Sequence, residues 1–206
     1  MADFINVHWE SKAIKILWIV IYGAVLIWSG IHPKDQPTWL LEVAPALIAV
    51  VVMAFTYRSF RLTPLLYGLI LVHSIILMIG GHYTYAEVPF FDHLFGATRN
   101  NYDKVGHFVQ GFVPALVARE ILLRKSVVNG RGWLGFIVVC ICLAISAFYE
   151  LIEWWVAVAI GQGANAFLGT QGYIWDTQSD MAFALLGAIC AVLFLSRLHD
   201  RQLARL

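Results

Sequence analysis

Charged residues are scarce in this chain of 206 residues, of which only 13% are Asp, Glu, Lys or Arg. With 60% hydrophobic residues and a mean hydropathy of +0.74, the composition excludes an ordinary soluble domain, which could not hide so much apolar surface. No block of basic residues is present, so nothing favours nucleic acid as a partner. The three cysteines all lie within apolar runs, and we expect them to pack without forming a disulfide.

Familiar site motifs are also missing. The sequence has no HExxH, CxxC or comparable ligand spacing, and the Gly-Gln-Gly at 161–163 lacks the strand and helix that surround a nucleotide loop. It has no internal repeat, low-complexity tract or shift in composition. One integral membrane domain covering residues 1–206 is the simplest interpretation.

Long apolar runs are what the sequence has instead. Since a helix needs about 20 mostly apolar residues to cross a bilayer, we expect an all-α polytopic membrane protein built as a bundle of about six transmembrane helices. These helices are predicted near residues 13–30, 39–57, 64–80, 104–123, 133–154 and 177–198. The first run leads into no small-residue cleavage site and should stay as an anchor. The fourth run is the most polar, and a kinked helix facing the bundle interior would explain its Gly111 and Pro114.

The distribution of Lys and Arg predicts the orientation. An arrangement with both termini in the cytoplasm places eleven of these residues inside and only Lys34, Arg99 and Lys104 outside. We therefore expect a protein of the bacterial inner (plasma) membrane, with the lipid bilayer as its surroundings. Two long outer loops follow, at 81–102 and 155–176. The first is rich in aromatic residues and is predicted to pack over the helix ends, where it could form a lid.

Carboxylates gather at the predicted outer ends of three helices. Charge at membrane depth is costly and is usually functional. The five residues are Asp103, Glu150, Glu153, Asp176 and Asp180. Spacings of three or four residues, including that of Asp103 and His107, allow the members of each helix to share one face. Three helices should therefore bring acidic groups to one depth.

Against Lys104 alone, these five acids give a formal charge balance of −4. Such a balance needs protonated acids, charged histidines or a bound cation, because burying an uncompensated carboxylate costs several kcal/mol. Mixed histidine and carboxylate ligands suit a divalent metal ion. The predicted metal ligands are Asp103, His107, Glu150, Glu153, Asp176 and Asp180. A purely structural ion network is the alternative interpretation.

Three segments carry a resemblance to a known family. They read NYDKVGHFVQGF at 101–112, FYELIEW at 148–154 and LGTQGYIWDTQSDM at 168–181. In this order they resemble the YjdF family of predicted bacterial inner-membrane proteins, which implies a membrane location and no particular reaction. A looser similarity reaches the VanZ-like membrane proteins, whose pattern would be filled here by Asp103, Lys104, His107, Phe108, Glu150, Asp176 or Asp180, and Gly187. Glu153 and the long Gly-rich loop before the last helix depart from that pattern.

Other assignments remain open for several of these residues. Lys104 is as well suited to neutralising Glu150 or Asp180, and so to fixing the helix register, as to a catalytic role. His73 is interpreted as a buried hydrogen-bonding residue, and His82 and His93 as interfacial residues of the first outer loop.

Two classes of function fit the residues. In the first, the protein is a membrane hydrolase in which a metal ion or a carboxylate activates water toward a lipid headgroup or an envelope precursor. Its catalytic residues would be Lys104, His107, Glu150, Glu153 and Asp180. In the second, the same carboxylates bind an ion or small solute for transport. Transport finds less support, because no inverted repeat is visible and we expect no matching acidic site in the cytoplasmic halves of the helices. A non-catalytic scaffold is the third alternative.

Overall fold

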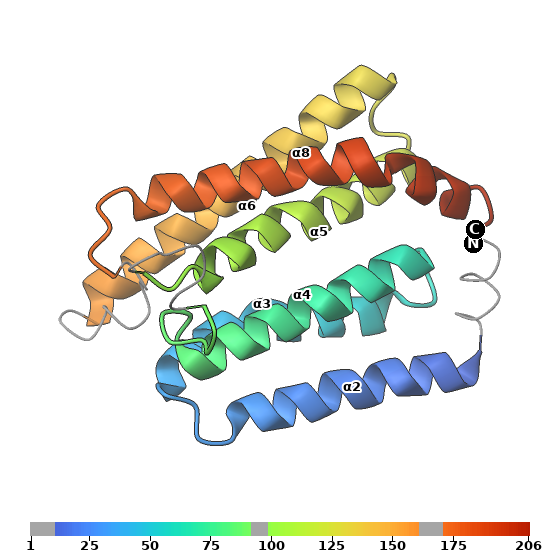
Figure 1. Ribbon diagram of the computed structural model, residues 1–206. Helices are drawn as coiled ribbons and strands as arrows, with labels where there is room; N and C mark the ends of the chain where they lie inside the picture. The colour runs from blue at the N-terminus through green and yellow to red at the C-terminus, as the bar shows by residue number, and fades with distance from the viewer. Residues whose placement is uncertain (1–10, 92–98, 161–170) are drawn as a thin grey trace.

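The computed structural model describes residues 11–91, 99–160 and 171–206, and within these ranges all regular secondary structure is helical. The helices are α2 (Lys12–Gly30), α3 (Gln36–Thr56), α4 (Pro64–Tyr83), α5 (Tyr102–Arg124), α6 (Arg131–Ile160) and α8 (Asp176–Leu203). Successive helices run in alternating directions along one bundle (Figure 1). The starts of α3, α5 and α8 therefore lie at the same end as the last turns of α2, α4 and α6. This end of the bundle is named the site end.

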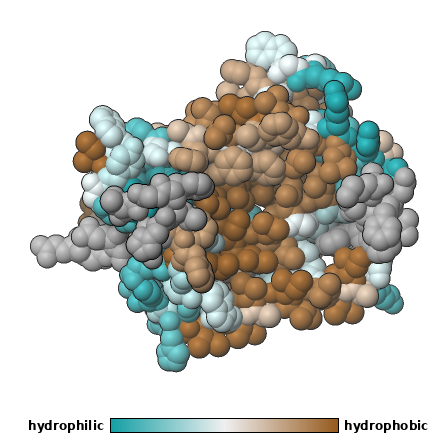
Figure 2. All heavy atoms as spheres, viewed as in Figure 1, coloured by the Kyte–Doolittle hydropathy of each residue, from teal (hydrophilic) through white to brown (hydrophobic). Residues whose placement is uncertain are grey.

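Five of these helices are long and apolar enough to cross a membrane: α2, α3, α4, α6 and α8. Hydrophobic side chains cover the middle of the molecule, and hydrophilic ones gather toward its two ends (Figure 2). The remaining helix, α5, has 23 residues but carries several charged side chains, and it contacts α4, α6 and α8. Contact with three other helices explains how α5 carries charge within an otherwise apolar bundle, because its polar side chains meet protein rather than lipid.

Most helix limits fall within three residues of their predicted positions, but the predicted ends of two helices were wrong. Helix α6 continues to Ile160 rather than ending at 154, and α8 continues to Leu203 rather than ending at 198. The extension of α6 places Glu150 and Glu153 two to three turns before its end. Trp154 and Trp155 are exposed on the same helix, as expected of side chains that face lipid or its interface.

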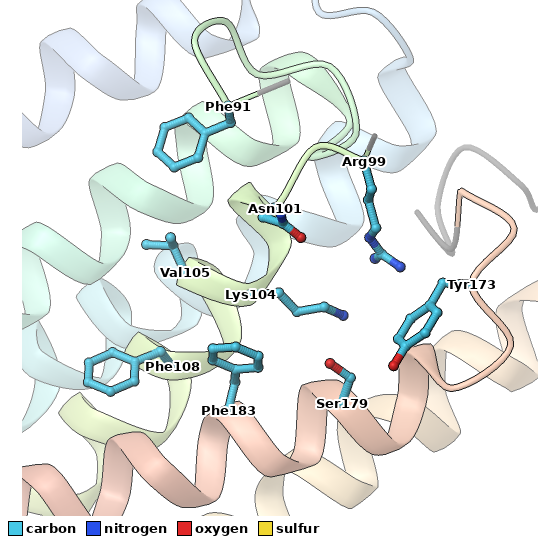
Figure 3. Close-up of a pocket in the computed structure, with 9 residues that line it drawn as sticks. All are labelled: Phe91, Arg99, Asn101, Lys104, Val105, Phe108, Tyr173, Ser179 and Phe183. Atoms are coloured by element: carbon cyan, nitrogen blue, oxygen red, sulfur yellow. The ribbon is translucent and has the colours of Figure 1, made fainter. Parts of the chain in front are cut away.

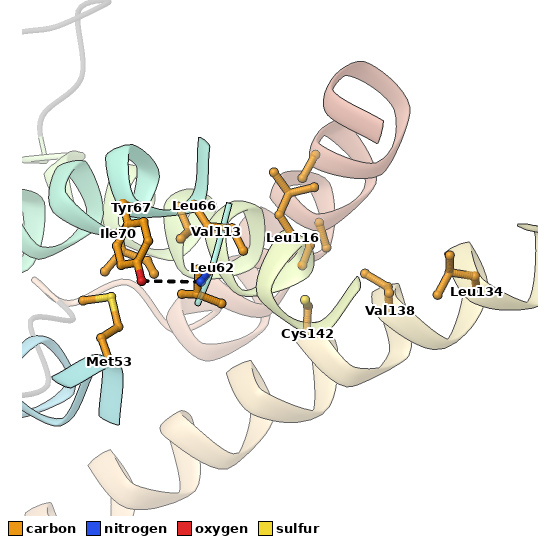
Figure 4. Close-up of a cluster of buried hydrophobic side chains, with 13 residues drawn as sticks. Met53, Leu62, Leu66, Tyr67, Ile70, Val113, Leu116, Leu134, Val138 and Cys142 are labelled. Carbon is orange, nitrogen blue, oxygen red and sulfur yellow. Dashed lines mark hydrogen bonds between the residues drawn. The ribbon is translucent and has the colours of Figure 1, made fainter. Parts of the chain in front are cut away.

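An apolar core fills the bundle away from the site end. Leu66, Ile70, Val113 and Leu116 are buried there, and the hydroxyl of Tyr67 accepts a hydrogen bond from the backbone N–H of Leu62 (Figure 4). Cys142 belongs to this core, and all three cysteines of the chain are free thiols. A second apolar cluster includes Val43 of α3, Met78 of α4 and Tyr85 from the segment after α4.

Tyr85 enters the bundle from the segment after α4, where two glycines leave room for its ring. A Cβ atom on Gly80 would lie 2.3 Å from the ring, and one on Gly106 would lie 2.9 Å from it. Burial holds the pKa of the Tyr85 hydroxyl well above its ordinary value, so the group is uncharged at neutral pH. This part of the predicted 81–102 loop therefore packs into the bundle; His93 and residues 92–98 lie outside the described residues.

Helices α5 and α8 approach each other so closely that their backbones touch at two glycines. A Cβ atom on Gly111 would lie 1.8 Å from the carbonyl oxygen of Ala184, and one on Gly187 would lie 2.0 Å from that of Phe108. Small residues that allow two backbones to touch are typical of helix pairs in membranes. This contact, named the glycine crossing, fixes how the two most polar helices face each other.

Gly111→Ala should destabilise the protein by more than about 2 kcal/mol, because the added methyl group has no space between the two backbones. Gly68→Ala is the matched control, since a Cβ atom there meets nothing within 4 Å and alanine favours a helix. Thermal unfolding of both variants in detergent measures the difference. Equal stability of the two variants would contradict the close backbone contact.

Candidate functional site

The site begins at the first turn of α5, which is fixed by residues on both sides of it. Asn100 is buried, its side-chain oxygen accepts a hydrogen bond from the Tyr102 N–H, and its side-chain nitrogen donates to the carbonyl of Val88. The side chain of Gln171 accepts from the backbone N–H of Asn100 and donates to its carbonyl oxygen, at 2.9 and 3.0 Å. These contacts hold the start of α5 beside the segment that leads into α8.

An ion network connects the starts of the two helices. The Lys104 Nζ atom lies 2.8 Å from an oxygen of Asp176, 2.5 Å from Asp180 and 3.5 Å from Asp103. Arg99 reaches the same Asp176 oxygen at 2.5 Å and Asp103 at 3.5 Å. Lys104 is 8% exposed, so these contacts form largely away from water. Asp176, a predicted metal ligand, is shared by these two cations in the structure.

Asp180 also belongs to a group of three side chains that could hold a metal ion. One ligand atom from each of Asp103, His107 and Asp180 can be chosen so that all three lie within 4.8 Å of one another. His107 Nε2 is 3.3 Å from Asp103 and 3.9 Å from Asp180, while its Nδ1 is 2.9 Å from the Gln110 side-chain oxygen. In the neutral tautomer whose Nδ1 donates to Gln110, His107 has its Nε2 lone pair available for a ligand.

This group borders a cavity of about 170 Å³ that extends toward the middle of the bundle. Its wall includes the predicted residues Asp103, His107, Glu153 and Asp180. Glu150 lies beside the group, with one oxygen 3.9 Å from His107 Nδ1; that oxygen is buried and accepts no hydrogen bond from the described residues. Side chains of α5, α6 and α8 therefore meet at one end of the bundle, as the helical spacing predicted.

Two members of the site were missed by the sequence analysis. Glu42 of α3 is buried, lines the same cavity and accepts a hydrogen bond from the Tyr149 hydroxyl at 2.9 Å. Glu42 could have been found as a single acid inside an apolar run, since charge at membrane depth is usually functional. Arg99 was counted only as an outer-loop charge, and nothing in its spacing relates it to Asp176.

Adding Glu42 and Arg99 to the site leaves its formal charge balance unchanged. Six carboxylates, now including Glu42, face two cations, Lys104 and Arg99, which leaves a formal balance of −4 before His107 is counted. Much of this charge lies in a region of low dielectric constant, where desolvation costs several kcal/mol per ion. Among the described residues, the carboxylates of this site therefore still need protons or a cation to compensate their negative charge.

A second, larger pocket of about 570 Å³ lies on the opposite face of α5, between the first turns of α5 and α8. Arg99, Lys104 and Tyr173 lie toward one side of it, and Phe108 and Phe183 toward the other (Figure 3). Lys104 lines this pocket and Asp180 lines the smaller cavity. Their ion pair thus lies between the two spaces.

The other predicted histidines lie outside the metal group. His73 lines the small cavity, and its Nε2 has no hydrogen-bond partner among the described residues. His82 bonds through Nδ1 to the carbonyl of Ser29 at 3.0 Å and packs on Trp28. The glycines at 161, 163 and 169 lie outside the described residues.

Comparison with known proteins agrees with the helical, apolar character of the chain. Residues 14–201 match the family described as predicted membrane protein (DUF2238). The chain belongs to this family. The inner membrane protein YjdF of Escherichia coli (strain K12) is 59% identical over 184 residues, which cover 88% of this chain and 88% of that relative. No solved structure matches the chain. The resemblance to the YjdF family is thereby confirmed, and the chain is a bacterial inner-membrane protein.

The expectation of no acidic site at the other end of the bundle was wrong. Glu120 of α5 is fully buried there, and its carboxylate accepts a hydrogen bond from the Thr63 hydroxyl at 2.9 Å. It also lies 2.8 Å from Arg124 and 2.9 Å from His199 Nε2 of α8. Arg119 donates to His199 Nδ1 at 3.1 Å, so the neutral ring carries its proton on Nε2 and donates it to Glu120. This set of residues is named the opposite cluster.

The same change from glutamate to glutamine should have different effects on stability at the two ends. Glu120→Gln removes a carboxylate that accepts from three side chains, and we expect a loss of about 3 kcal/mol. Glu153→Gln removes one negative charge from a site with an excess of them, so stability should be unchanged or higher. Urea or thermal unfolding of both variants tests this difference, and a greater loss in Glu153→Gln would contradict the assignment of excess charge to the site end.

Proposed function

We propose that the chain forms one integral membrane domain over residues 1–206, in which all six helices cross the bilayer and both termini are cytoplasmic. The strongest support is the excess of Lys and Arg at the end opposite the site, where Arg58, Arg61, Arg124 and Lys125 lie. In this orientation the site end faces the periplasm. A polar α5 surrounded by other helices is consistent with a sixth span.

We further propose that Asp103, His107 and Asp180 bind a divalent metal ion. The observation that carries this proposal is the meeting of these three ligand types beside a cavity whose surroundings have an excess of negative charge. Gln110 adds support, because a metal-binding histidine commonly donates its second N–H to a fixed oxygen. A bound ion would supply the missing positive charge and polarise an oxygen of the substrate or of water.

The reaction that fits this arrangement is hydrolysis of a bond in a lipid headgroup or an envelope precursor. Glu150 is placed to accept a proton, since its buried oxygen near His107 accepts no hydrogen bond from the described residues. Glu153, on the wall of the cavity one turn further along α6, is the second candidate for this base. His107 holds the ion or transfers the proton, Asp180 positions Lys104, and Lys104 stabilises the negative charge that develops on the substrate.

Ion or small-solute transport is the second candidate. The opposite cluster favours it, because polar groups of α5 and α8 now occur at both ends of the same helix pair. Against it, the glycine crossing brings the two backbones into contact between the polar ends, and Leu116 and Val113 fill the adjacent core. Transport would require this contact to open, whereas hydrolysis at one face does not. A non-catalytic scaffold would leave the excess charge of the site without a role.

Topology is tested with single cysteines introduced into a cysteine-free variant in intact cells. A cysteine at Lys34 should react with a membrane-impermeant maleimide, because this residue is expected on the periplasmic side. A cysteine at Arg201 should react only after the cells are opened. Labelling of the cysteine at position 201 in intact cells would contradict the proposed orientation.

Metal binding is tested by elemental analysis of protein purified in detergent with Zn²⁺ or Mn²⁺ and freed of excess ion. The unchanged protein should retain about one ion per chain, and Asp103→Asn and Asp180→Asn should each lower the affinity at least tenfold. Glu87→Gln is the control, since Glu87 is an exposed acid at the same end, paired with Lys34. Full retention of the ion in both aspartate variants would exclude the metal site.

A further inference from the structure

The pocket between the first turns of α5 and α8 has two chemically different halves. Lys104 and Arg99 supply positive charge at one side, and Asn101 and Ser179 add polar groups (Figure 3). Phe91, Val105, Phe108 and Phe183 form the apolar remainder of the wall. A space of about 570 Å³ is within the range of pockets that hold small organic ligands.

The two cations are close enough to act on one group. Arg99 Nη2 and Lys104 Nζ contact the same oxygen of Asp176 at 2.5 and 2.8 Å, so the two nitrogens lie within about 5.3 Å of each other. Tyr173 also faces both, with its ring centre 5.4 Å from the Arg99 guanidinium and 5.8 Å from Lys104 Nζ. A guanidinium and an ammonium at this separation can bind different oxygens of one phosphate.

The apolar half continues onto the surface of α8 that faces lipid. Phe183 is partly exposed, and Leu186 and Leu193, three and ten residues further along, are more exposed. These spacings place the three side chains on about the same face of the helix. A chain attached to a bound headgroup could leave the pocket along this face and enter the bilayer.

We propose that this pocket binds the phosphate-bearing headgroup of a lipid, with Arg99 and Lys104 on the phosphate and the aromatic side chains on the start of its chain. The lipid is the substrate class of the neighbouring metal site, so this part of the proposal rests on the proposed function. The headgroup would lie one side chain away from that site, because Asp180 separates Lys104 from His107.

The arrangement also couples the two ligands. Without a metal ion, Lys104 is neutralised by Asp180, Asp176 and Asp103. An ion bound to Asp103 and Asp180 competes with Lys104 for those two carboxylates, which leaves Lys104 with Asp176, a carboxylate that it shares with Arg99, and so makes its positive charge more available to the pocket. The metal should therefore tighten the binding of phosphate, and linkage requires the reverse effect to be equal.

The test is isothermal titration calorimetry of the full chain in a phosphate-free detergent, with dihexanoyl phosphatidic acid as probe. Lys104→Gln and Arg99→Gln should each weaken binding about tenfold or more, and Lys34→Gln, at an exposed cation of the same end, should leave it unchanged. Ser179→Trp fills the pocket without altering a charge and should also abolish binding. Unchanged affinity in Lys104→Gln and Ser179→Trp would overturn the proposal.

Two comparison probes identify the source of the phosphate. Dihexanoylglycerol, which lacks phosphate, and inorganic phosphate, which lacks a chain, should both bind more weakly than the lipid. Inorganic phosphate binding as tightly as the lipid would overturn the assignment of the apolar half to a lipid chain.

Repeating the titration with Mn²⁺ separates the two proposals. Mn²⁺ should tighten lipid binding in the unchanged protein and not in Asp180→Asn, which also controls for direct contact between the ion and the lipid. Lipid binding that depends on Lys104 without any Mn²⁺ binding would support the pocket and contradict the metal site. Mn²⁺ binding without lipid binding would support the metal site and contradict the lipid pocket. A lipid affinity that does not change when Mn²⁺ is bound would overturn the coupling.

Discussion

The ammonium group of Lys104 contacts carboxylates at both of the first two turns of α8, and the geometry of the site end depends on these ion pairs. They join the starts of α5 and α8, while the glycine crossing fixes the same two helices further along. With both attachments in place, Asp180 has one oxygen on Lys104 and the other toward His107. The ion pair therefore positions a metal ligand and also forms the boundary between the two cavities.

The two polar ends of the bundle differ in how fully their groups are paired. In the opposite cluster, Glu120 receives hydrogen bonds from Thr63, Arg124 and His199, as expected of groups that stabilise a fold. At the site end, six carboxylates face two cations, and one oxygen of Glu150 accepts no hydrogen bond from the described residues. Unpaired buried charge lowers stability, and proteins commonly retain it where binding or catalysis requires it. This contrast is why the function is assigned to the site end.

The helical architecture could be predicted from the sequence, because the length of an apolar run reports directly on whether a helix can cross a bilayer. Helical spacing then placed Asp103, His107 and Asp180 at one depth, and the structure brings them together. Glu42 could have been found from the sequence as a single acid inside an apolar run, whereas the pairing of Arg99 with Asp176 and of Glu120 with His199 could not, because each pairing depends on which segments are neighbours. Helical periodicity describes one helix at a time, and the glycine crossing that selects the α5 and α8 faces is visible only in three dimensions.

The proposed metal site requires a cation to bind between Asp103, His107 and Asp180 at the acidic end of the bundle. Electron paramagnetic resonance of the purified protein with one equivalent of Mn²⁺ is the decisive measurement, because the spectrum of a bound ion reports on its ligands. We expect a bound Mn²⁺ signal with coupling to one imidazole nitrogen, and loss of that coupling in His107→Gln. A spectrum of free Mn²⁺, or a bound ion whose nitrogen coupling persists in that variant, would contradict the proposed metal site.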